Sequence, residues 1–156
     1  MNNKRRSFMK SSAAAGAFGV AVSAGLIVPR AVLAAWPKAA FEATEVNAAV
    51  QGSLGSSAMT DSSDITLKAP EIAENGAVVP ITITSKIPNT ESISLLISEN
   101  PTPLTAVFKF GSGSEGFVST RVKMSKTSDV IAVVKSGGKL FSTKLAVKVT
   151  IGGCGG

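Results

Sequence analysis

The feature that most restricts the fold is a repeated alternation of apolar and polar residues between Asp64 and Ile151. Because successive side chains of a strand point to opposite faces, this alternation predicts half-buried β-strands, and the Gly, Pro, Asn and Ser clusters between the runs predict turns. About seven short strands are expected, at 65–69, 79–84, 92–98, 104–110, 117–124, 130–134 and in a final segment that ends with 145–151. Their spacing, with no long helical pattern among them, predicts an all-β protein with a β-sandwich fold, with a barrel as the alternative.

Three local features refine this expectation. The run 130–134 is apolar at every position and therefore predicts a strand in the middle of a sheet. Pro80 lies inside the run 79–84 and indicates an edge strand or a bulge, since proline lacks the N–H that a central strand uses. The segment 136–139 contains Gly137 and Gly138, which predict a tight hairpin.

Residues 35–63 precede the predicted sandwich, which spans 64–151. A helix is expected after the first residues of this segment, because Pro37 suits a first turn and Gly52 suits a C-terminal stop. Its apolar face would comprise Phe41, Val46, Ala49 and Val50. The Gly- and Ser-rich segment 52–63 then indicates a linker.

Residues 1–34 have the pattern of a twin-arginine (Tat) export signal. Arg5 and Arg6 stand in a basic segment, 11–28 is mildly apolar, and Ala34 ends the small-residue pattern of a cleavage site. A membrane-anchoring helix is the alternative, and the serines and glycines of the apolar run and its end at Pro29 disfavour it. We expect export by the Tat translocase and cleavage after Ala34, or after the next alanine.

Removal of this signal changes the charge of the chain. The whole sequence has 16 basic and ten acidic residues and a net charge of +6, but five of the basic residues lie in the signal. The remaining chain therefore carries 11 basic and ten acidic residues, a net charge of +1. The basic character belongs mainly to the signal, and nucleic-acid binding is not indicated.

Cys154 is the only cysteine, and the sequence has no histidine. No internal disulfide can form, so in an oxidising compartment the thiol is expected to be free or to make an intermolecular bond. The absence of histidine excludes Ser-His-Asp triads, Cys-His nucleophile pairs and zinc sites with Cys and His ligand sets. The residues thus indicate neither an enzyme nor a metal site.

The C-terminal segment 152–156 places this cysteine between two pairs of glycines, Gly152 and Gly153 before it, Gly155 and Gly156 after it. Glycine has little conformational preference, so the segment predicts a flexible arm that extends roughly 10 Å from the last strand. An exposed thiol with a pKa of about 8.5 is mostly protonated at neutral pH and makes a poor catalyst but a good attachment point. The sequence leaves open a carrier thiol, an interchain disulfide and an incidental cysteine.

Several segments resemble the SoxY family, the carrier subunits of the periplasmic sulfur-oxidation (Sox) system. The tail 149–156 is similar to the C-terminus of that family, and the segments 65–76, 117–121 and 130–138 also resemble it. The likeness covers essentially the whole chain after the signal, and the twin-arginine signal fits the same pattern. The region 36–63 is the part that matches least.

The resemblance implies an immunoglobulin-like sandwich in a heterodimer with SoxZ. It also implies that Cys154 carries sulfur intermediates covalently, with no other cofactor, while partner enzymes do the chemistry. In that scheme the cytochrome SoxAX conjugates thiosulfate, the hydrolase SoxB releases sulfate, and SoxCD, where present, oxidises the remaining sulfur. The alternative is an exported β-sandwich interaction module that dimerises through an interchain disulfide.

Overall fold

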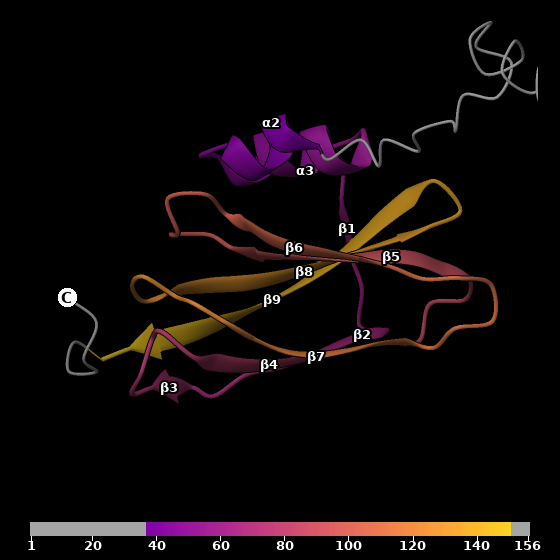
Figure 1. Ribbon diagram of the computed structural model, residues 1–156. Helices are drawn as coiled ribbons and strands as arrows, with labels where there is room; N and C mark the ends of the chain where they lie inside the picture. The colour runs from indigo at the N-terminus through magenta and orange to yellow at the C-terminus, as the bar shows by residue number, and fades with distance from the viewer. Residues whose placement is uncertain (1–36, 151–156) are drawn as a thin grey trace, which may run out of the picture. The chain divides into compact units, whose positions relative to one another are not determined.

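The computed structural model describes residues 37–150. Two short helices precede nine strands (Figure 1). The helices are α2 (Lys38–Glu42) and α3 (Val46–Leu54), and the strands are β1 (Thr60–Asp61), β2 (Ile65–Lys68), β3 (Ile72–Ala73), β4 (Val79–Ser85), β5 (Thr90–Ile97), β6 (Leu104–Lys109), β7 (Gly116–Val122), β8 (Ser128–Ser136) and β9 (Lys139–Val149). Within 37–150, no helix is long and apolar enough to cross a membrane.

The strands form two sheets, which confirms the predicted all-β sandwich. One sheet has the order β1-β9-β8-β5-β6, with β3 pairing to β9 as well, and the other has the order β2-β4-β7. The chain changes sheet between β4 and β5, returns between β6 and β7, and changes again between β7 and β8. These connections place the three strands β2, β4 and β7 in one layer and the strands β5, β6, β8 and β9 in the other. The two-residue strands β1 and β3 account for the strands beyond the expected seven.

The main core lies between the two sheets. Alternate residues of the strands point inward, as in β4, where Val79, Ile81 and Ile83 are fully buried while Thr82 and Thr84 are partly exposed. From the opposite sheet, β5 and β8 contribute fully buried residues to the same cluster, among them Ile93, Leu95, Ile97, Val130 and Val134. The inward face of β4 thus follows directly from the period-two pattern of the sequence.

A second apolar cluster covers the outer face of the larger sheet. Helices α2 and α3 lie over this sheet (Figure 1) and pack Ala40, Ala49 and Val50 against residues of its strands. The sheet contributes Leu96 from β5, Leu104 from β6, Val133 from β8 and Leu140 from β9. Strand β8 lies between β5 and β9, so the central position predicted for 130–134 is confirmed. Its apolar residues on the second face are explained by the helices.

The helical region differs from the single helix expected to end at Gly52. The chain is extended at Ala43, which separates α2 from α3, and α3 continues through Gly52 to Leu54. Gly55, with a left-handed φ of 83°, ends the helix instead. A Cβ on Gly52 would lie 3.2 Å from Cα of Ala40, so this glycine allows the two helices to approach each other closely. The segment expected as a linker contains β1, which pairs in parallel with β9.

The predictions for the hairpin at 136–139 and for Pro80 have opposite outcomes. The hairpin at 136–139 is confirmed, with Ser136 paired to Lys139 and positive φ angles at both glycines between them. Pro80 is neither on an edge strand nor at a bulge, because β4 is the middle strand of its sheet and its pairing with β7 is continuous. Strand β2 covers β4 only from Thr82 to Ser85. Pro80 therefore lies beyond the end of β2, where only β7 lies beside the strand.

Candidate functional site

The residues that the sequence singled out for function lie outside the described part of the chain. These are Cys154, its flanking glycines Gly152, Gly153, Gly155 and Gly156, and the signal residues Arg5 and Arg6. The structure does describe the chain up to Thr150, four residues before the cysteine. The candidate site is therefore built here from the last residues before the tail, 148–150, which we call the root of the arm.

The root of the arm is hydrogen-bonded on both of its edges. On one edge, the Lys148 N–H donates to the Glu71 carbonyl at 2.9 Å and the Thr150 N–H donates to the Ala73 carbonyl at 3.2 Å. On the other edge, the Val149 N–H donates to Oγ1 of Thr127 at 2.9 Å. The same hydroxyl donates to the Val149 carbonyl at 3.4 Å. Figure 1 shows β3 beside the end of β9.

The segment that carries β3 continues to Gly76, which makes a further close contact with the root of the arm. The Met124 N–H donates to the Gly76 carbonyl at 2.7 Å, which ties this segment to the end of β7. A Cβ on Gly76 would lie 2.6 Å from the Met124 carbonyl oxygen and 2.8 Å from Cγ1 of Val149. Only glycine fits this position without displacing its neighbours.

Charged groups near the root of the arm are of both signs and exposed. Lys126 forms an ion pair with Glu99 at 3.0 Å, and both side chains are more than half exposed. Pairs of this kind contribute about 0–1 kcal/mol to stability. The geometry of the root is therefore set by backbone hydrogen bonds, the Thr127 hydroxyl and close packing.

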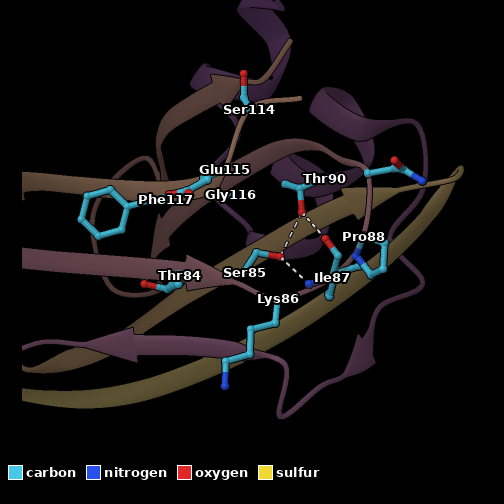
Figure 2. A pocket seen from close by; sticks show the side chains of 11 residues that line it. Thr84, Ser85, Lys86, Ile87, Pro88, Thr90, Ser114, Glu115, Gly116 and Phe117 are labelled. Atoms are coloured by element: carbon cyan, nitrogen blue, oxygen red, sulfur yellow. Dashed lines mark hydrogen bonds between the residues drawn. The ribbon is translucent and has the colours of Figure 1, made fainter. Parts of the chain in front are cut away.

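Residues 37–150 contain no group of three or more His, Cys, Asp or Glu side chains that could hold a metal ion. A hollow of about 340 Å³ lies at the far end of β4, beside the start of β7 (Figure 2). Three of its residues bond to one another: Oγ of Ser85 and Oγ1 of Thr90 are 3.0 Å apart, Oγ1 of Thr90 donates to the Ile87 carbonyl at 2.9 Å, and the Ile87 N–H donates to Oγ of Ser85 at 3.2 Å. These bonds stabilise the β4–β5 turn.

Sequence reasoning missed the residues that hold the root of the arm. The sequence predicts a strand at 65–69 and a turn that ends at Gly76, but it assigns neither Gly76 nor Thr127 a role at the root of the arm. A glycine beside an Asn turn and an exposed threonine carry no local signal of this kind. The partners are distant in the chain, and only the fold brings them together.

The fold and the root of the arm define a class of protein: a small two-sheet β-sandwich whose last strand is fastened at its end and leads into a cysteine-bearing tail. Comparison with known proteins specifies the family. The family model described as "Sulfur oxidation protein SoxY" matches residues 50–154, a range that includes all nine strands of the sandwich and ends at Cys154. The chain therefore belongs to the SoxY family of sulfur-oxidation proteins.

One solved structure agrees with this assignment. The structure of the sulfur carrier protein SoxY from Chlorobium limicola f thiosulfatophilum is 42% identical to this chain, with a TM-score of 0.61, and the match covers 66% of this chain and 94% of that one. A chain in a structure concerning T-cell activation by toxic shock syndrome toxin-1 is 11% identical with a TM-score of 0.39, covering 55% of this chain and 99% of that one. The latter likeness is too weak to carry an argument. A search of curated proteins finds no match.

Proposed function

We propose that this protein is a covalent carrier of sulfur intermediates in periplasmic sulfur-compound oxidation, with Cys154 as the attachment point. One observation carries the proposal: the match to the SoxY family runs through the tail to the only cysteine in the chain. The similar Chlorobium protein is described as a sulfur carrier, which supports the same role here. The glycines on both sides of Cys154 would let the tail enter narrow active sites of partner enzymes.

The proposed chemistry uses the thiol as a handle. Thiosulfate is joined to the sulfur of Cys154 with loss of the thiol proton and of two electrons, which a c-type cytochrome such as SoxAX accepts. Water then cleaves the terminal S–S bond of this adduct in a hydrolase such as SoxB, which releases sulfate and leaves a persulfide on the carrier. SoxCD, where present, would oxidise that remaining sulfur. In this proposal the carrier itself catalyses none of these steps and is not an enzyme.

The same proposal includes partners and location. A SoxZ-type subunit would form a heterodimer with this chain, and the twin-arginine pattern would deliver the folded pair to the periplasm through the Tat translocase. Support for the location comes from the family and from Arg5 and Arg6 in the sequence. Beyond the covalently bound sulfur no cofactor is invoked.

Intact-mass spectrometry tests the central claim. The processed heterodimer is incubated with thiosulfate and the oxidising partner complex, and the mass of this chain should rise by the mass of one thiosulfate adduct, reversible by reductant. The Cys154→Ser variant should show no mass increase and should abolish thiosulfate oxidation by the reconstituted system. Unchanged oxidation with the serine variant would refute covalent carriage.

The odd cysteine also favours a second candidate, an exported β-sandwich module that dimerises through an interchain disulfide. This reading predicts a stoichiometric disulfide dimer on non-reducing gels under all conditions and no sulfur adduct. The carrier proposal predicts no stoichiometric disulfide dimer and a sulfur adduct on Cys154. The two readings therefore differ in a single gel and mass measurement.

A further inference from the structure

We propose that residues 71–76 and Thr127 form an anchor for the root of the arm, and that Thr127 and Gly76 are positioning residues for transfer of the carried sulfur. In this proposal the anchor fixes the point from which the tail leaves the sandwich and so sets the reach of Cys154. The inference rests on the proposed carrier function. Its structural part concerns only described residues.

On one edge of β9, the side chain of Thr127 takes the place of a neighbouring strand. Strand β8 begins at Ser128, which pairs with Val147, so β9 continues two residues beyond the last backbone pair. There the hydroxyl of Thr127 accepts from the N–H of Val149 and donates to its carbonyl. A hydroxyl has one donor and two acceptor positions and can serve both groups. The strand thus stays paired where its neighbour has ended.

On the other edge, the anchor is a short parallel pair. Residues Ile72 and Ala73 of β3 align with Lys148 and Val149 of β9. The carbonyl groups of Glu71 and Ala73 accept hydrogen bonds from the N–H groups of Lys148 and Thr150. Together with the Thr127 contact, three consecutive amides of the root are bonded, alternately on the two edges. Chain ends usually fray unless they are tied down. Val149 and its buried partner Ala73 pack against the main core, whereas the side chains of Lys148 and Thr150 are exposed. The backbones of Lys148 and Thr150 are therefore held by hydrogen bonds.

The fit of Gly76 shows that the anchor is closely packed. Its backbone passes between the Met124 carbonyl and the Val149 side chain at distances that leave no room for a Cβ. The hydrogen bond from Met124 to the Gly76 carbonyl holds it there. Any side chain at this position would push the segment with β3 away from β9.

Loss of the anchor would lengthen the tether that carries the Cys154 thiol. With the root paired, Cys154 is four residues from Thr150; if pairing is lost back to Val147, the free tether grows to seven residues. The effective concentration of a tethered group falls roughly as the −3/2 power of tether length, which amounts to about a twofold loss here. Loss of a defined exit direction lowers the effective concentration of Cys154 further. We therefore expect the anchor to affect the encounter of Cys154 with the partner enzyme and not the chemical step.

The test measures partner-enzyme kinetics and hydrogen exchange on the same variants of the heterodimer. Thr127→Val removes the hydroxyl at nearly constant shape, Thr127→Ser restores it, and Gly76→Ala displaces the segment with β3. Matched controls are Thr66→Val, an exposed strand threonine with no side-chain hydrogen bond, and Gly111→Ala, where a Cβ meets nothing closer than 3.8 Å. Initial rates of thiosulfate conjugation are recorded against carrier concentration.

We expect KM for the carrier to rise about two- to fivefold in Thr127→Val and Gly76→Ala, with kcat within about twofold of wild type. Thr127→Ser and both controls should have wild-type kinetics. The amides of Val149 and Thr150 should exchange at least about fivefold faster in the two anchor variants, while amides of β5 and β8 keep their protection.

Two results would overturn the anchor alone: wild-type exchange at the root in both variants, or faster exchange with an unchanged KM. Either result would leave the carrier function intact, because Cys154 would still be loaded. If the wild-type protein itself takes up no thiosulfate adduct, the proposed function fails and the positioning role fails with it. The mass measurement separates these cases.

Discussion

Thr127 and Gly76 act on the same strand end through different properties. Thr127 supplies a hydroxyl where a backbone partner is missing, and Gly76 supplies space where two backbones nearly touch. Thr127 is exposed, and exposed residues are commonly expected to tolerate substitution with little effect on stability. A single hydrogen bond contributes about 0.5–1.5 kcal/mol, so its loss would unpair the strand end without unfolding the sandwich.

The glycines of the tail allow a separate prediction. Replacing Gly153 and Gly155 by valine should leave the melting temperature within about 2 °C of wild type, because both follow the last strand of the sandwich in the sequence. Turnover by partner enzymes should fall at least about tenfold, since β-branched side chains stiffen and thicken the segment. Thermal melts and steady-state rates on the same preparation check both halves. Wild-type turnover would show that the glycines are not needed.

Strand β8 is covered on both faces, by the opposite sheet on one and by the helices on the other. Its residues alternate between the inter-sheet core, through Val130 and Val134, and the helix-covered face, through Val133. Each face needs an apolar surface, so the strand has no polar residue between 130 and 134. By contrast, β4 has its outer face open and shows the alternation of a half-exposed strand.

Substitution on the two outer faces tests this difference. Val133→Ala should lower the free energy of unfolding by about 2 kcal/mol, because it removes fully buried methyl groups beneath the helices. Thr82→Ala, on the open face of β4, should cost less than about 1 kcal/mol. Urea unfolding followed by circular dichroism measures both. Equal costs would mean that α2 and α3 do not protect the sheet in solution.

At the scale of the whole molecule, the sandwich separates its two ends. The root of the arm lies where β9 ends and β4 begins, whereas the hollow beside Ser85 lies at the other end of β4. There the hydroxyls of Ser85 and Thr90 bond to each other across the β4–β5 turn.

The absence of histidine has a consequence for the stability of the whole chain. Histidine is the side chain whose ordinary pKa falls between pH 5 and 8, so no such group changes charge in that range on folding. We expect the melting temperature to vary by less than about 3 °C between pH 5.5 and pH 7.5. Scanning calorimetry in two buffers of equal ionic strength checks this, and a steep slope would indicate a coupled carboxyl group.

The sequence alone determined the strands, the all-β class and the site chemistry to be expected. Strand alternation is a local pattern, and a single cysteine among glycines is visible without any coordinates. The resemblance in the tail and in 65–76 led to the SoxY family, which the family match then confirmed. The site residues Cys154, Arg5 and Arg6 stay predictions, since the structure describes neither end of the chain.

Only the tertiary structure decided which residues meet. It showed that Gly52 serves helix packing instead of ending a helix, and that Pro80 can sit in a middle strand because β2 stops short of it. It also brought Ala73 and Thr127 to opposite edges of the root of the arm. The physical reason is that a local pattern records which face of a strand is buried, whereas partners far apart in the chain are chosen by the packing of the whole sandwich.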